Sequence, residues 1–197
     1  MKVSRVPARL PLAARIITEV FAPTVLVTLV LIASPLILPD VTLAQTAVAI
    51  LFVTALPFSA VFVLARRGKL SDHHVGMRSQ RGPVMAFAGV SIIVGLWILS
   101  LMQAPLAFHR LIFTVLLGLA LSMAVNLVWK LSVHAAVAAF FAAMLASAAL
   151  PIGLLWAALP LAVGWSRVQL QDHTWPQVIA GWAAGVGIYV FYLAFLS

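Results

Sequence analysis

The sequence predicts an all-α integral membrane protein, a polytopic helical bundle of roughly six to seven transmembrane helices. Of its 197 residues, 64% are hydrophobic and only 8% are charged, whereas about 25% of the residues of a soluble domain are charged. Several apolar runs also reach the roughly 20 residues that a helix needs to cross a bilayer. These spans leave no room for a separate soluble domain, so residues 1–197 are expected to form a single transmembrane domain.

The first four apolar segments are long enough to span a bilayer. They cover residues 16–38, 42–65, 84–103 and 107–129. The first is expected to be retained as a helix, because its apolar run exceeds the roughly 7–15 residues of a signal-peptide core. Pro39-Asp40, the polar stretch 66–83 and Pro105 separate the four segments. Proline and clustered polar residues both interrupt transmembrane helices, so these positions predict loops.

The last three apolar segments follow the polar residues around Lys130. They cover residues 133–149, 152–165 and 177–196. The first two are short for a complete span, and Pro151 separates them. We therefore expect a tight hairpin that tilts little or stops short of the far side of the membrane. The third has full length and follows Pro176, a residue type that is favoured in the first turn of a helix.

The excess of basic residues predicts the topology. The chain has 12 Lys and Arg against 4 Asp and Glu, a net charge of +8. If the helices alternate in direction, 11 of the 12 basic residues share the face that also receives the N-terminus, and Arg110 alone lies on the other. The positive-inside rule assigns that face to the cytoplasm, in a multi-pass protein of the cell (inner) membrane. We expect the lipid bilayer as a partner and no nucleic acid.

Polar residues that are unusual in a membrane protein gather on the same face, in three clusters. They are residues 72–83, 130–134 and 166–177. The clusters supply several cations, histidines and hydroxyls but only two carboxylates, Asp72 and Asp172. Ionisable residues at a membrane indicate function by default. Arginine binds phosphate oxygens through two hydrogen bonds, helix N-termini add N–H donors, and histidine acts as nucleophile or general acid. The clusters therefore predict a phosphate site.

Each cluster also has a simpler interpretation. Arginines in loops beside a membrane usually report topology or bind lipid headgroups, and a histidine at a helix start usually caps the helix. Asp72-His73-His74 with Asp172-His173 could form a mixed metal site, but the neighbouring arginines would repel a cation. The chain has no cysteine, which excludes disulfides, thiolate catalysis and cysteine metal sites. We expect no metal and no other cofactor.

The third cluster resembles the last signature of the type 2 phosphatidic acid phosphatase superfamily, the lipid phosphate phosphatases. That signature reads S-R-x5-H-x3-D. Here Ser166-Arg167 is followed by five residues and His173, and three further residues lead to Gln177 in place of the aspartate.

The other two signatures of the superfamily are matched in the right order. The second, P-S-G-H, is matched by residues 131–134, which keep the serine and the histidine. The first, K-x6-R-P, is matched loosely, because His74 stands seven residues before Arg81 and Pro83 comes one residue late. The chain is thus similar to a divergent member of this superfamily, with its motifs at 72–83, 130–134 and 166–177.

The resemblance implies a metal-independent phosphatase with three catalytic residues. By it, His173 is the nucleophile that forms a phosphohistidine. His134 protonates the leaving lipid alkoxide and later activates water. Gln177 can accept a hydrogen bond from Nδ1–H of His173 and so fix its tautomer, but it adds no countercharge.

A second group of residues is expected to bind the phosphate of the substrate. They are His74, Arg78, Arg81, Lys130, Ser132, Ser166 and Arg167. Most occupy signature positions, and donors of this kind stabilise the charge that develops on a transferring phosphoryl group. Arg78 and Lys130 lie outside the signatures, and we include them for their charge and location.

The sequence thus favours an integral-membrane lipid-phosphate phosphatase that hydrolyses a phosphomonoester or diphosphate of a polyprenyl lipid or glycerolipid at the cytoplasmic face. Two alternatives stay open. One is a non-hydrolytic relative of the same fold that binds or transfers a lipid phosphate. The other is an unrelated polytopic protein whose arginines serve topology alone. If Arg81, His134, Arg167 and His173 converge on one pocket, the phosphatase and its non-hydrolytic relative are favoured over the unrelated protein.

Overall fold

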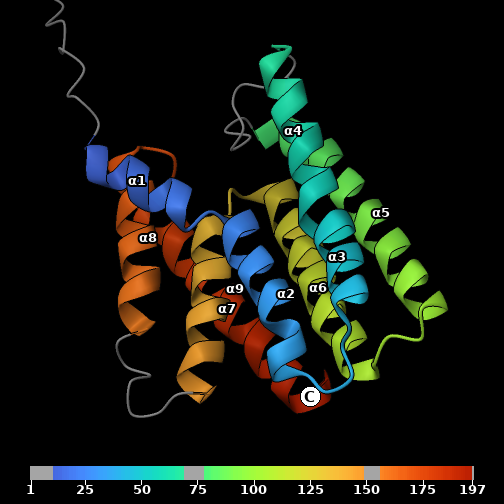
Figure 1. Cartoon of the computed structure of the whole chain (residues 1–197). Coiled ribbons are helices and arrows are strands. Elements are labelled where there is room, and N and C mark those ends of the chain that lie inside the picture. Colours follow the sequence, from blue (N-terminus) through green and yellow to red (C-terminus); the bar gives the residue numbers. More distant parts are fainter. Residues whose placement is uncertain (1–10, 69–77, 149–155, 197) are drawn as a thin grey trace, which may run out of the picture.

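The chain folds into an all-helical bundle (Figure 1). The computed structural model describes residues 11–68, 78–148 and 156–196, and their side chains except those of 78–81, 148 and 196. No strand occurs in these ranges. Within the described residues, five stretches are long and apolar enough to cross a membrane, namely Leu12–Ile37, Leu43–Arg66, Gly82–Leu101, Leu106–Val128 and Trp175–Phe195. Large apolar side chains such as Leu36 and Val128 are exposed, as a lipid-facing surface requires. The protein is therefore a multi-pass helical membrane protein.

The first apolar segment, expected as one helix over 16–38, forms two helices. α1 (Leu12–Val20) ends at Phe21, and α2 (Pro23–Ile37) starts after Ala22. The extended backbone of Ala22 (φ −60°, ψ 147°) interrupts the helix. Pro23 then takes the first turn of α2, where a missing N–H leaves no bond unmade.

The break turns α1 away from the axis of α2, so that α1 lies across the end of α8 (Ala158–Gln169) (Figure 1). The two helices are joined by a hydrogen bond of 3.0 Å between the hydroxyls of Thr18 and Ser166, both fully buried.

The second span contains a π-helical turn, η1 (Leu51–Ala55), between α3 (Leu43–Ile50) and α4 (Leu56–Arg66). In it the Leu56 N–H donates to the Leu51 carbonyl five residues earlier. Pro57 has no N–H to continue this pattern with the Phe52 carbonyl. The Ser91 hydroxyl of α5 (Arg78–Leu101) donates to that carbonyl instead, at 2.6 Å. Neighbouring side chains commonly satisfy backbone groups that proline frees inside a membrane.

Two clusters of buried apolar side chains hold the bundle together. The larger joins α2, α3, η1 and α5 to α6 (Leu106–Val128) around Phe108 and Leu31. The smaller joins α2 to α7 (Val133–Ala148) and α8 through Leu26, Ala138 and Val163. Because α2 contributes to both clusters, it connects the two halves of the molecule.

The predicted hairpin corresponds to α7 and α8, which lie side by side (Figure 1). They contain 16 and 12 residues, or about 24 and 18 Å at 1.5 Å per residue. Both lengths fall below the roughly 30 Å of a hydrocarbon core, which agrees with a hairpin that stops short of the far side. The residues around Pro151 lie outside the described ranges.

Small residues bring α7, α8 and α9 (Trp175–Phe191) into close contact. A Cβ atom at Gly181 would lie 2.6 Å from the Ser132 carbonyl oxygen, and one at Gly185 would collide with the Ala136 carbonyl. A Cβ atom at Gly164 of α8 would meet Val178 of α9 at 2.7 Å. Close backbone approach at small residues is the usual way to pack membrane helices. α9 is followed by a π-helical turn, η3 (Tyr192–Leu196).

Candidate functional site

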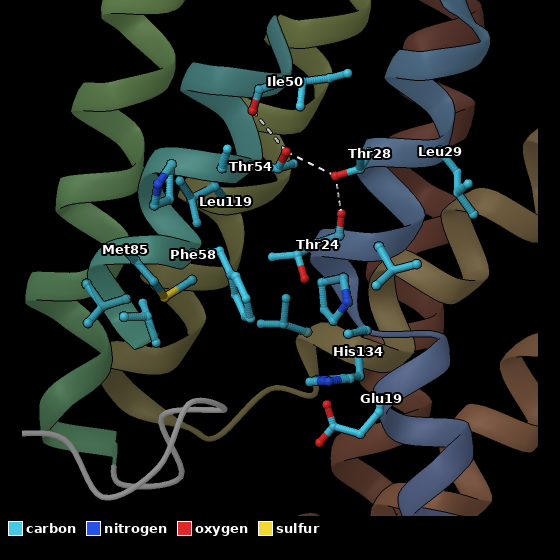
Figure 2. A pocket seen from close by; sticks show the side chains of 18 of the residues that line it. Glu19, Thr24, Thr28, Leu29, Ile50, Thr54, Phe58, Met85, Leu119 and His134 are labelled. Atoms are coloured by element: carbon cyan, nitrogen blue, oxygen red, sulfur yellow. Dashed lines mark hydrogen bonds between the residues drawn. The ribbon is translucent and has the colours of Figure 1, made fainter. Parts of the chain in front are cut away.

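A pocket of about 610 Å³ lies among the helices and is lined in part by residues of the second and third polar clusters. Its polar end is lined by Glu19, His134, Arg167 and His173. Figure 2 shows Glu19 and His134 at this end, with Thr28 and Ile50 at some distance along the pocket. The remaining lining comes mostly from apolar side chains of α2, η1, α4, α5 and α6. The site therefore joins a charged head to an apolar channel.

The turn after α8 brings Arg167 and His173 to the pocket. Gln171 adopts the left-handed conformation (φ 61°), and its N–H donates to the Val168 carbonyl at 3.0 Å. The Asp172 N–H donates to the Arg167 carbonyl at 3.1 Å, and the His173 N–H donates to the same oxygen at 3.2 Å. This bonding pattern is a Schellman C-cap. The five residues between arginine and histidine are thus the length of one helix cap.

Arg167 is 97% buried and is paired with an acid in this turn. Its Nη2 lies 3.0 Å from Oδ2 of Asp172, a side chain with 38% exposure. Lys130 fixes the same turn from the other side, since its Nζ donates to the Asp172 carbonyl at 2.6 Å. Asp172 therefore orients the guanidinium, and Lys130 holds the loop that carries both residues.

The Gln177 amide determines the tautomer of His173. The Thr174 N–H donates to Gln177 Oε1 at 3.2 Å, in a capping box that starts α9. This bond identifies Oε1 as the amide atom that faces His173 Nδ1 at 3.1 Å. An oxygen can only accept, so Nδ1 carries the proton and Nε2 keeps its lone pair. The contact expected between Gln177 and His173 is present.

The two serines of the signatures hold helix ends. Ser132 is the N-cap of α7, where its Oγ accepts from the Ala135 N–H at 3.4 Å. Ser166 donates to the Val163 carbonyl at 2.7 Å, so the hydrogen bond between the two hydroxyls has Thr18 as its donor. Both serines are fully buried, and neither lines the pocket. Their contacts in this structure are structural ones.

Three of the four residues that had to converge do line one pocket: His134, Arg167 and His173. The fourth, Arg81, stands in the first turn of α5 together with Arg78, but both side chains lie outside the description. His74 lies outside the described residues altogether. The start of α7 and the start of α9 are tied directly, because the Ser132 N–H donates to the Gln177 carbonyl at 3.3 Å.

Sequence reasoning missed Glu19 and the apolar channel. Glu19 is the single acidic residue within the first apolar segment, and an ionisable side chain in such a segment was a usable signal. The channel had no such signal, because the residues that line it have the composition of any transmembrane helix.

Comparisons of the chain with protein-family models, with curated proteins and with solved structures found no match.

Proposed function

We propose that this protein is an integral-membrane lipid-phosphate phosphatase that hydrolyses a phosphomonoester or diphosphate of a lipid through a phosphohistidine. One observation supports the proposal more than any other. His134, Arg167 and His173, which come from two separate sequence clusters, line the same end of one pocket. Two histidines and a buried arginine are the groups that metal-free phosphoryl transfer requires.

The proposed reaction has two steps. In the first, the Nε2 lone pair of His173 attacks phosphorus, the bond from phosphorus to the lipid oxygen breaks, and His134 gives its proton to that oxygen. In the second, water attacks phosphorus while His134 takes a proton from it. The N–P bond then breaks, and inorganic phosphate leaves. Gln177 supports the first step, because its contact with Nδ1 keeps the lone pair on Nε2.

Arg167 is the proposed stabiliser of the phosphoryl oxygens. A guanidinium has five N–H donors, so the pair with Asp172 at 3.0 Å orients the group without exhausting it. Lys130, Arg78, Arg81 and His74 stay proposed phosphate ligands from charge and sequence position. Ser132 and Ser166 support the site through the helix ends that they hold.

A lipid is the proposed substrate because the pocket continues as an apolar channel between membrane-spanning helices. Such a channel can hold an alkyl or prenyl chain while the phosphate reaches the histidines. Burial of apolar area, at roughly 25 cal/mol per Å², then contributes to binding. Thr28 and Thr54, whose hydroxyls are 3.0 Å apart, are polar residues in this channel.

The catalytic end is proposed to face the cytoplasm. In Figure 1 the end of α4, α1 and the start of α7 lie at the same end of the bundle, and α6 starts at the other end. Arg66 and Arg67 end α4, Arg15 belongs to α1 and Lys130 precedes α7, whereas Arg110 belongs to the beginning of α6. This distribution favours the cytoplasmic side by the positive-inside rule. A cysteine introduced at Ser71 should resist labelling by an impermeant thiol reagent in intact cells, and ready labelling would reverse the assignment.

The proposal is tested by phosphate release from detergent-solubilised protein supplied with a panel of lipid phosphates. We expect release that survives EDTA, because the reaction uses no metal, and that is abolished by His173→Ala. Saturable binding of a lipid phosphate without release would support the non-hydrolytic alternative. Inhibition by EDTA that added Mg²⁺ reverses would exclude the histidine mechanism.

A further inference from the structure

We infer that Glu19 is a positioning residue for His134, an inference that rests on the proposed function. Both residues line the polar end of the pocket. In Figure 2 the Glu19 carboxylate points toward the His134 ring. Glu19 belongs to none of the three signatures, and it is one of only 4 acidic residues in the chain.

The position of Glu19 in its helix is electrostatically unfavourable. It is the penultimate residue of α1, where the helix carries partial negative charge. A carboxylate near a helix C-terminus is disfavoured, and one in an apolar membrane segment is costlier still. A carboxylate in such a place indicates a functional role, with a nearby positive group that compensates its negative charge. The cationic pocket end supplies that environment.

A buried contact fixes the backbone next to Glu19. Thr18, its neighbour in sequence, bonds to Ser166 at 3.0 Å, and Ser166 is in turn the neighbour of Arg167. The clamp between α1 and α8 therefore stands directly beside two pocket residues. Thr18 and Ser166 are both fully buried, so the clamp is part of the packed interior. The Glu19 side chain itself is exposed, so the clamp fixes the backbone that carries it and does not itself constrain the carboxylate.

The chemistry of the first step explains why a carboxylate belongs here. Phosphate binding alone would exclude it, because two anions repel each other. His134, however, must be protonated when the lipid oxygen leaves, and a neighbouring carboxylate stabilises the imidazolium. Glu19 stays ionised throughout, and the proton moves from His134 to the lipid oxygen. Gln177 gives His173 no charge, whereas Glu19 gives one to the second histidine.

Activity on two substrate types tests the role. Glu19→Gln should lower kcat for an alkyl phosphate by about tenfold or more, with KM changed by less than about threefold. The loss should shrink for an aryl phosphate, whose leaving oxygen needs no proton, and Glu19→Asp should recover part of it. Asp40→Asn, which removes a carboxylate beyond the opposite end of α2, is the matched control and should have no effect. Equal losses on both substrates, or an effect on KM alone, would overturn the inference.

Thermal unfolding of the full-length protein in detergent gives a readout that is independent of activity. Glu19→Gln, His134→Gln and the double variant form a double-mutant cycle. If the two side chains interact, the double variant should lose less Tm than the two single variants together. Additive losses would refute the interaction. If the wild-type protein releases no phosphate from any lipid, the proposed function is wrong. The double-mutant cycle would still show whether Glu19 and His134 interact.

Discussion

The helices α7 to α9 and the helices α2 to α5 are built in different ways. The first group packs through glycine and alanine, so closely that a Cβ atom at Gly181 would lie 2.6 Å from a neighbouring carbonyl oxygen. The second group carries a π-helical turn, and it forms most of the channel wall. The group with the closest backbone contacts carries the two histidines, whereas the group with the π-helical turn faces the proposed lipid tail. Functional groups are positioned most accurately on rigid elements.

After the complete loss expected for His173→Ala, the largest effect should come from the second histidine, which α7 carries. His134→Ala should slow hydrolysis of an alkyl phosphate by about 10²–10⁴-fold, the usual contribution of a general acid. The loss should be smaller for aryl phosphates, because their leaving oxygen departs without a proton. Steady-state rates across a series of leaving groups measure this. A loss that does not vary with the acidity of the leaving group would remove His134 from the role.

The next effect concerns the packing of the same group. Gly185→Ala should destabilise the protein by about 1–3 kcal/mol, because the new methyl group collides with the Ala136 backbone. Gly187→Ala is the matched control on the same helix, since no atom lies within 4 Å of its Cβ position. The control should be neutral, or stabilising by up to ~1 kcal/mol. Thermal unfolding in detergent compares the two variants, and equal Tm values would contradict the difference in packing.

A third variant tests the wall of the apolar channel. Ala55 lines the channel, and Ala55→Phe should reduce kcat/KM for long-chain lipid phosphates by about tenfold, or ~1.4 kcal/mol. Short-chain phosphates should be hydrolysed as before, because they do not reach this part of the channel. Ala47→Phe, at an exposed position of α3 that does not line the channel, is the control. A loss that is the same for short-chain and long-chain substrates would mean that the lipid tail does not occupy the channel.

The smallest effect should come from Gln177→Glu. Glutamate also suits the capping box that starts α9, and it adds the countercharge that the imidazolium of His173 lacks. We expect the protein to stay folded and kcat to rise by less than about tenfold. Gln177→Met, which cannot accept either hydrogen bond, should lower both kcat and Tm. A kcat lower in the glutamate variant than in the wild type would mean that the neutral amide itself is required.

The sequence predicted the arrangement of the fold well and its interruptions poorly. Every apolar segment contains a helix, because hydrophobic length is a strong signal in membrane proteins. The break before Pro23 was missed, because proline in an apolar run indicates either a kink or a new helix. The π-helical turn was missed as well, since the group that satisfies its freed carbonyl is Ser91 of another helix.

The functional site stays a prediction, but some contacts of its residues followed from their spacing and others did not. The Gln177 contact followed from sequence, because residues four apart on a helix start can meet. The partners of Ser166 and Lys130 did not follow, because one contacts α1 across 148 positions and the other contacts a backbone carbonyl. Glu19 needed the fold as well, since its nearness to His134 depends on the break between α1 and α2.

The π-helical turn η1 also bears on how the specificity of such a protein could change. A turn of this kind is one residue longer than its α-helical equivalent, and one residue corresponds to about 100° of rotation around a helix axis. Deleting a single residue within Leu51–Ala55 would therefore let this turn close as ordinary α-helix, and the side chains that the turn itself presents would shift by one position. The channel would acquire a new set of side chains, while α7, α8 and α9 would keep their sequence. A single codon deletion could thus alter which lipid is accepted and leave the histidines in place.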